Sequence, residues 1–283
     1  MRKIVSIHKN NPTLEGAGVK LKRVFGAHDI PTFDPFLLLD HFGSDNPKDY
    51  IKGFPWHPHR GIETVTYMIA GEVKHGDSIG NKGTIRSGDV QWMTAGSGII
   101  HQEMPQPFKG ESRGFQLWVN LPQKNKMTAP RYKGLTKKNL VYTTKDDAKI
   151  IIISGTVNGK TGPMEDLFVK VEYLDIHLDG KFAHKTDKKT AFIYVYEGKV
   201  DIEGQKVSAG HCALLEKKGD IKVSGKGKFI FVAGNPLDEP IAWGGPIVMN
   251  TEEELQGAFK ELDEGNFIKG KHPGQVEEDF YKD

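Results

Sequence analysis

The chain has 283 residues, and its 39 basic residues nearly balance its 37 acidic ones, so the formal net charge is only +2. This balance excludes nucleic-acid binding driven by charge alone, and no apolar run approaches the roughly 18 residues that span a bilayer. The N-terminal residues MRKIVSIHKNN lack the apolar region of a signal peptide. The single cysteine, Cys212, excludes an internal disulfide and indicates a reducing, cytoplasmic compartment.

Short segments rich in β-branched and aromatic residues, separated by glycine and proline turns, predict an all-β protein. In chain order, strands are expected at residues 64–69, 114–122, 149–154 and 168–176. In the second of these, alternate residues are apolar and should share one buried face: Phe115, Leu117, Val119 and Leu121. Residues 122–134 show no periodicity and predict a connection between domains. Its lysines, Lys124 and Lys126, are expected on the solvated surface.

One helix is expected, near the end of the chain. Thr251 can cap it, the acidic residues that follow suit a first helical turn, and Gly265 should end it. Its apolar stripe consists of Leu255, Ala258, Phe259 and Leu262.

Two stretches of the chain resemble each other. Residues 67–73 (YMIAGEV) resemble residues 194–200 (YVYEGKV), and a glycine turn follows each of them. We therefore expect two copies of one barrel-like unit, an N-terminal domain at residues 1–134 and a C-terminal domain at residues 135–283 that also holds the helix.

A histidine pair lies in the first copy. Residues two apart in a strand point to the same side, so His57 and His59 should point together. If the strand continues unbroken, the same face includes Glu63, and Thr64 and Thr66 face outward. Pro58 removes a backbone donor, which predicts a strand start or an edge strand.

A second pair, His101 and Glu103, repeats this spacing on a later strand. Three imidazoles and a carboxylate that meet at one point suit Fe(II) and its neighbours among the divalent metals, and the absence of thiolates argues against a structural zinc cage. A His-x-His pair alone is weak evidence, because a buried histidine is more often a hydrogen-bonded core residue. The remaining histidines have no such partners and are interpreted as structural or solvated: His8, His28, His41, His75, His177, His184, His211 and His272.

Glu63 is compatible with two roles, as a metal ligand or as a hydrogen-bond partner of a ligand imidazole. We favour the second.

Longer motifs carry a resemblance to a known family. HPHRGIETVTYMIAGE at 57–72 is similar to the first cupin motif, and GDVQWMTAGSGIIHQE at 88–103 is similar to the second. The second differs from the general cupin pattern at Thr94 and Glu103, and the pirin family shares these differences. Three more stretches resemble pirin signatures: DPFLLLDHFG at 34–43, MTAGSGIIHQEMP at 93–105 and GGPIVMNTEEEL at 244–255.

The resemblance implies two tandem cupin barrels, of the double-stranded β-helix or jelly-roll type, with a short C-terminal helix. It implies one divalent metal in the N-terminal cupin domain, held by His57, His59, His101 and Glu103. The internal repeat places His184 at the position of His57 but Thr186 at the position of His59, so the C-terminal cupin domain is expected to bind no metal. Fe(II) is the metal we expect, with Mn, Ni, Co, Cu and Zn as alternatives.

Because the family includes proteins resembling quercetin 2,3-dioxygenases, the resemblance implies a dioxygenase that uses dioxygen to cleave a flavonol-like aromatic substrate. Glu103 would be the catalytic base. The alternative is a non-enzymatic, iron-redox-responsive interaction protein or transcriptional cofactor with a protein partner, and a sugar isomerase is a third hypothesis. The sequence leaves open whether the chain forms a homodimer.

Overall fold

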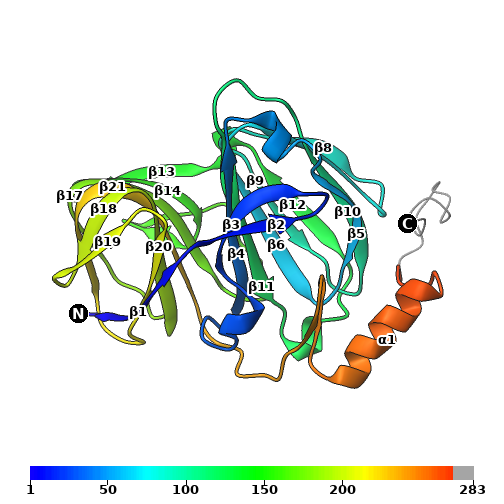
Figure 1. Cartoon of the computed structure of the whole chain (residues 1–283). Coiled ribbons are helices and arrows are strands. Elements are labelled where there is room, and N and C mark those ends of the chain that lie inside the picture. The colour runs from blue at the N-terminus through cyan, green and yellow to red at the C-terminus, as the bar shows by residue number, and fades with distance from the viewer. Residues whose placement is uncertain (270–283) are drawn as a thin grey trace. The chain divides into compact units, whose positions relative to one another are not determined.

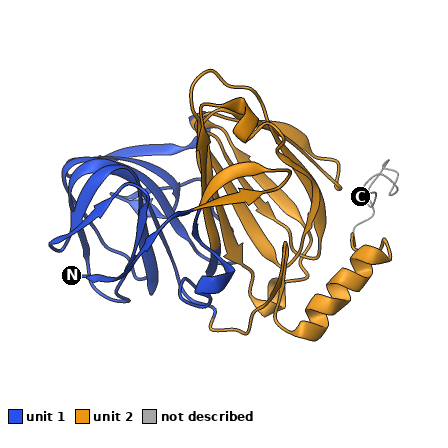
Figure 2. Ribbon diagram, viewed as in Figure 1, with its two compact units in different colours: residues 1–11, 23–37, 138–237 blue, residues 12–22, 38–137, 238–283 orange. Residues whose placement is uncertain are grey.

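A computed structural model describes residues 1–269 of the chain, which are almost entirely β-strands (Figure 1). The chain divides into two compact units (Figure 2). Unit 1 comprises residues 1–11, 23–37 and 138–237, and unit 2 comprises residues 12–22, 38–137 and 238 onward. The all-β prediction is confirmed, and each unit has its own sheets.

Unit 1 is built around an eight-stranded antiparallel sheet. Its strands, in sheet order, are β1 (Ile4–Lys9), β20 (His211–Leu215), β18 (Thr190–Ile202), β21 (Ile221–Gly234), β17 (Glu172–His184), β14 (Ala148–Ser154) and β13 (Val141–Lys145), with β19 (Gln205–Ser208) paired to β18. A small hairpin joins β15 (Thr156–Val157) to β16 (Lys160–Thr161). Alternate residues of the long strands, such as Leu174 and Ile176 on β17, form the apolar core of this unit.

Unit 2 contains two sheets and carries the histidine motifs. The larger has the order β12 (Arg131–Leu135), β9 (Val90–Thr94), β6 (Ile62–Ala70), β11 (Ser112–Asn120), β4 (Phe36–Ser44), β3 (Val19–Phe25) and β2 (Asn11–Glu15). The smaller has the order β5 (Phe54–His59), β10 (Ile99–Pro105), β7 (Glu72–Asp77) and β8 (Lys82–Arg86). The predicted alternation on β11 is confirmed, because Phe115, Leu117 and Val119 on this strand and Leu121 just after it are 0% exposed.

Unit 2 is completed by the end of the described chain. A short hairpin joins β22 (Ala242–Gly244) to β23 (Ile247–Met249) and leads into α1 (Glu252–Asp263). The predicted helix start is confirmed, since Thr251 accepts a hydrogen bond from the Glu254 backbone and the Glu254 side chain returns one. Four short 3-10 turns lie at Ala27–Asp29, Pro47–Asp49, Gln123–Asn125 and Lys137–Asn139.

The compact units differ from the domains expected at 1–134 and 135–283. Strand β1, at the start of the chain, pairs with β20 and so belongs to unit 1, and the hairpin and helix after residue 237 belong to unit 2. Residues 131–134, expected to be part of a connection, belong to β12, which pairs with β9. A strand with little apolar periodicity gives no sequence signal when its pairing partner lies far away in the chain.

No helix in the described part of the chain is long and apolar enough to cross a membrane.

Candidate metal centre

The two histidine motifs lie on neighbouring strands of the smaller sheet in unit 2. Strand β5 is at the edge of that sheet, as Pro58 predicted, and it pairs antiparallel with β10. The register places His101 directly opposite His57 and places Ile99 opposite His59. Strand pairing therefore brings together side chains that are more than 40 positions apart in the sequence.

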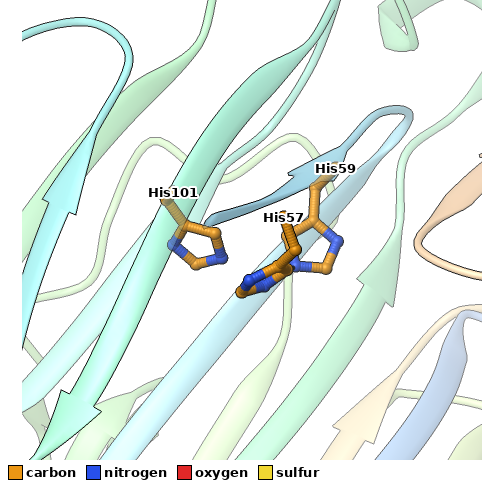
Figure 3. Close-up of side chains that lie close together, drawn as sticks. All are labelled: His57, His59 and His101. Carbon is orange, nitrogen blue, oxygen red and sulfur yellow. The ribbon is translucent and has the colours of Figure 1, made fainter. Parts of the chain in front are cut away.

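His57, His59 and His101 form a compact group (Figure 3). One nitrogen of each ring lies within 4.8 Å of the corresponding nitrogens of the other two. The two Nε2 atoms of His57 and His59 are 3.1 Å apart. Nitrogens that bind one metal at about 2.1 Å and at roughly right angles are separated by about 3 Å, so this spacing suits a shared ion.

The contacts of Nδ1 in His57 and His59 determine which ring nitrogens carry lone pairs. His57 Nδ1 lies 2.8 Å from the carbonyl oxygen of Pro55, and His59 Nδ1 lies 3.1 Å from that of Pro246. A carbonyl only accepts, so both Nδ1 atoms carry a hydrogen and, in neutral rings, both Nε2 atoms carry lone pairs. Two lone pairs facing each other at 3.1 Å repel unless a cation lies between them. The arrangement therefore fits a metal ion.

Burial keeps these rings neutral. It lowers the pKa of His57 and lowers the pKa values of His59 and His101 well below the usual histidine value. His101 is 1% exposed, and within the described chain neither of its ring nitrogens has a hydrogen-bond partner. A buried polar atom without a partner is costly, and a metal–nitrogen bond would remove that cost.

Glu103, the predicted fourth ligand, is not part of the histidine group. Its Oε1 lies 3.1 Å from the hydroxyl of Thr66, which is also 2.6 Å from Oε1 of Gln116. Burial raises the pKa of Glu103 to about 7. Because the Thr66 hydroxyl has a single hydrogen, it can donate to Gln116 while a protonated Glu103 donates to it. The role of Glu103 as a ligand stays a prediction.

The prediction for Glu63 and Thr66 was wrong about their faces. The carboxylate of Glu63 accepts hydrogen bonds from Trp92 Nε1 at 3.1 Å and from Thr94 Oγ1 at 2.7 Å, and not from a ligand imidazole. Thr66, expected outside, instead shares the face of Glu103. The cause is a break between β5 and β6 at Gly61, which has a φ of +78° and ends the alternation assumed for a single strand.

Polar side chains that the sequence reasoning did not single out lie near Glu103. His75 stacks on Tyr132, with ring centroids 6.0 Å apart, and its Nε2 lies 2.9 Å from Nε2 of Gln91. Burial, and the nearby carboxylates of Asp77 and Glu103, raise the pKa of the Tyr132 phenol. Tyr132 lies on β12, which was expected to be a loop, so no sequence signal marked it.

Lys126 was predicted to be solvated, and this was wrong. It is 2% exposed, and its ammonium donates to the carbonyl oxygens of Gly61 and Val248 and to Asn120 Oδ1, at 2.6–3.0 Å. Burial lowers the pKa of Lys126 to about 7. Two of its partners, Gly61 and Val248, are distant in the sequence, so only the fold reveals them.

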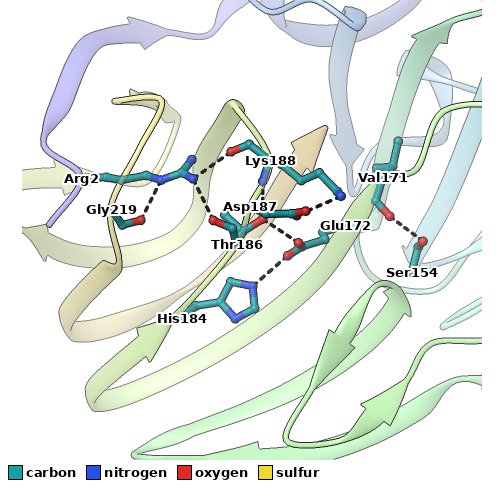
Figure 4. Close-up of polar contacts among 9 residues, drawn as sticks. All are labelled: Arg2, Ser154, Val171, Glu172, His184, Thr186, Asp187, Lys188 and Gly219. Carbon is teal, nitrogen blue, oxygen red and sulfur yellow. Dashed lines mark hydrogen bonds and ion pairs between the residues drawn. The ribbon is translucent and has the colours of Figure 1, made fainter. Parts of the chain in front are cut away.

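The second copy of the motif has a different arrangement, in unit 1 (Figure 4). His184 Nε2 lies 2.8 Å from Glu172, whose other carboxylate oxygen accepts from the Thr186 hydroxyl at 2.6 Å. Arg2, 1% exposed, donates to the carbonyl oxygens of Gly219, Thr186 and Lys188 at 2.8–3.0 Å. These contacts tie the start of the chain to this unit. Of the other histidines interpreted as structural or solvated, His272 lies outside the described residues.

Comparison with known proteins agrees with this architecture. Residues 18–119 match the pirin family, and residues 173–268 match the C-terminal cupin domain of pirins. A pirin-like protein of Caulobacter vibrioides is 41% identical over 274 residues, which cover 94% of this chain and 99% of the relative. The expected fold of two cupin domains with a short C-terminal helix is thus confirmed.

Solved structures give the same result. The crystal structure of a quercetin 2,3-dioxygenase from Acinetobacter baumannii matches with a TM-score of 0.88 and 33% identity, over 94% of this chain and 98% of that one. A bacterial pirin from Escherichia coli, solved in complex with nickel(II), matches with a TM-score of 0.63 and 21% identity, over 82% of this chain and 98% of that one. The second match is a likeness of fold.

Proposed function

The chain belongs to the pirin family, and on that premise we propose that it is a metal-dependent dioxygenase that cleaves a flavonol-like aromatic substrate. The observation that carries the proposal is the pair of lone-pair-bearing Nε2 atoms of His57 and His59, 3.1 Å apart beside His101. The match to a quercetin 2,3-dioxygenase structure supports the choice of substrate class.

His57, His59 and His101 would hold the metal, with Glu103 as the fourth ligand, and Fe(II) is the ion we propose. Neutral imidazoles and a carboxylate suit the divalent metals from Mn to Zn, and a site with few protein ligands keeps positions open. A metal of this kind, when bound, supplies a Lewis acid and a binding position for dioxygen.

Glu103 is the proposed general base. A base works best when its pKa lies near the working pH, and burial raises the pKa of Glu103 to about 7. The proton of a flavonol hydroxyl would pass to a carboxylate oxygen of Glu103, and the Thr66 hydroxyl, 3.1 Å from Oε1, would hold that carboxyl in place. Gln116 in turn fixes the Thr66 hydroxyl.

The test is to load the protein with Fe(II) without oxygen, and then to expose it to air with quercetin. We expect the flavonol absorbance to fall in the wild type, and not in His57→Ala, which lacks one of the three imidazoles. His177→Ala is the matched control, because His177 lies in unit 1 with its side chain 38% exposed and should keep full activity. Turnover that survives in His57→Ala would show that this site is not the catalytic one.

A further inference from the structure

The last described segment of unit 2, residues 239–268, packs directly against the strand that carries His101. Ile100, the neighbour of His101 on β10, belongs to an apolar cluster whose other members all come from this segment: Ala242, Ile247, Met249, Leu255, Ala258 and Phe267. These side chains are at most 7% exposed. The segment is therefore part of the core beneath the candidate metal centre.

The same segment supplies a hydrogen-bond acceptor to a candidate ligand. The carbonyl oxygen of Pro246 lies 3.1 Å from His59 Nδ1, although the two residues are 187 positions apart. This contact places the ring hydrogen on Nδ1 and leaves Nε2 free to bind a metal. Two residues on, the Val248 backbone N–H donates to the Arg60 carbonyl, and the Val248 carbonyl accepts from Lys126.

Arg60, the residue after His59, connects both histidine motifs to the end of the segment. Its guanidinium is 2% exposed and donates to the carbonyl oxygens of Ser97 and Phe267, each at 2.8 Å. It also forms an ion pair with Glu261 at 2.7 Å and lies 4.1 Å from the centre of the Phe267 ring. Ser97 lies in the turn that leads into β10 and His101.

We propose that residues 239–268 are a positioning element of the metal centre, so that docking of this segment and binding of the metal stabilise each other. When the segment is docked, Pro246 fixes the tautomer of His59, and Arg60 holds the two histidine strands in register. Coupling between two binding events is reciprocal: if docking raises metal affinity, the metal must strengthen docking by the same factor. The proposal rests on metal binding at the proposed site and does not depend on flavonol cleavage.

The first experiment compares two buried phenylalanines. Phe267→Ala removes a ring that is 0% exposed and lies against the guanidinium of Arg60, and Phe229→Ala removes an equally buried ring from the core of unit 1. Ni(II) is the probe, titrated by calorimetry at a temperature at which both variants are folded. We expect the Kd for Ni(II) to rise about tenfold in Phe267→Ala, because a loosened segment weakens the contact of Pro246 with His59 and loss of such an outer contact to a metal ligand typically costs 10–100-fold. In Phe229→Ala the Kd should change less than twofold.

Two further variants make smaller changes in the same region and should raise the Kd for Ni(II) less. Phe267→Leu keeps an apolar side chain against the cluster and should recover most of the affinity. If Phe267→Ala does not fold, Glu261→Gln replaces it, because Glu261 is partly exposed and its loss of charge weakens its ion pairs with Arg60 and Lys269 without removing an apolar side chain from the cluster. We expect a Kd two- to fivefold higher for Glu261→Gln.

The second experiment measures the reciprocal effect by amide hydrogen exchange. Ni(II) should slow exchange in β23 and α1 of the wild type and leave both unchanged in His57→Ala. Equal Ni(II) affinity in Phe267→Ala and Phe229→Ala, or exchange in α1 that does not respond to Ni(II), would overturn the proposal. If the protein shows both effects but does not cleave quercetin, this inference stands and the proposed function is wrong.

Discussion

At the scale of single residues, the candidate metal centre depends on which nitrogen of each imidazole carries the hydrogen. His57 and His59 each give their Nδ1 hydrogen to a backbone carbonyl, so their Nε2 lone pairs converge. Neither carbonyl belongs to a side chain, so no substitution can remove it directly. The tautomers are thereby set by the path of the backbone, which makes the site sensitive to changes in the fold around it.

Thr66→Val tests the contact between Thr66 and Glu103. Valine has nearly the same shape as threonine but cannot hold the Glu103 carboxyl at 3.1 Å or bond to Gln116. We expect quercetin turnover by the Fe(II)-loaded protein to fall roughly tenfold while the bound metal, measured by elemental analysis, is unchanged. Thr64→Val, on the same strand, is the control for a β-branched substitution. A loss of metal in Thr66→Val would instead mean that Thr66 supports the ligands.

Sequence reasoning singled out His57 and His59, and His101 with Glu103, because a two-residue spacing is a local property of a strand. It placed Glu63 and Thr66 on the wrong faces because it assumed one unbroken strand from His57 to Ile69. A Cβ atom at Gly61 would collide with the Val248 carbonyl, so the break at that glycine depends on a segment almost 190 residues later. A contact of that range has no signature in the local pattern.

At the scale of elements, β6, β11 and β23 meet at the ammonium of Lys126. Its three acceptors lie just before β6, at the end of β11 and within β23, and its burial could not be read from a stretch without periodicity. Helix α1 is the opposite case. Its capping residue and acidic first turn are neighbours in the sequence, and its start was predicted correctly.

Lys126→Met tests whether titration of this lysine makes the free energy of unfolding depend on pH. Burial lowers the pKa of Lys126 to about 7 in the folded chain, against 10.5 for an ordinary lysine. Between these values the unfolded chain binds more protons, so the wild type gains stability as the pH rises, and the methionine variant lacks this gain. From pH 7 to 9 we expect the wild type to gain about 2 kcal/mol over the variant, at 1.36 kcal/mol per pKa unit.

Urea unfolding of both proteins at several pH values measures this difference. Lys124→Met, in the same segment, is the control and should show no such pH-dependent difference. A wild-type-to-Lys126→Met difference that stays flat from pH 7 to 9 would mean that the three oxygen acceptors hold the ammonium charged despite its burial.

At the scale of the whole molecule, the two units have related strand patterns but differ in the contacts of one pair of corresponding histidines, His57 and His184. In unit 2, His57 faces two other imidazoles, whereas in unit 1 the corresponding His184 lies 2.8 Å from the carboxylate of Glu172. Glu172 also accepts from Thr186, so this histidine belongs to a hydrogen-bonded network within its own unit. The repeat in the sequence suggested this loss of ligands, and the partner of His184 became clear only from the fold.

His184→Ala should therefore separate stability from metal binding. The substitution leaves the Glu172 carboxylate with the Thr186 hydroxyl but without its imidazole partner, and we expect a loss of about 1–3 kcal/mol in the free energy of unfolding. Metal content after loading with Fe(II) should stay at one ion per chain, whereas His101→Ala should lose the ion. Elemental analysis and thermal unfolding of the two variants measure both quantities. Two ions per wild-type chain, or half the metal in His184→Ala, would assign a second metal site to unit 1.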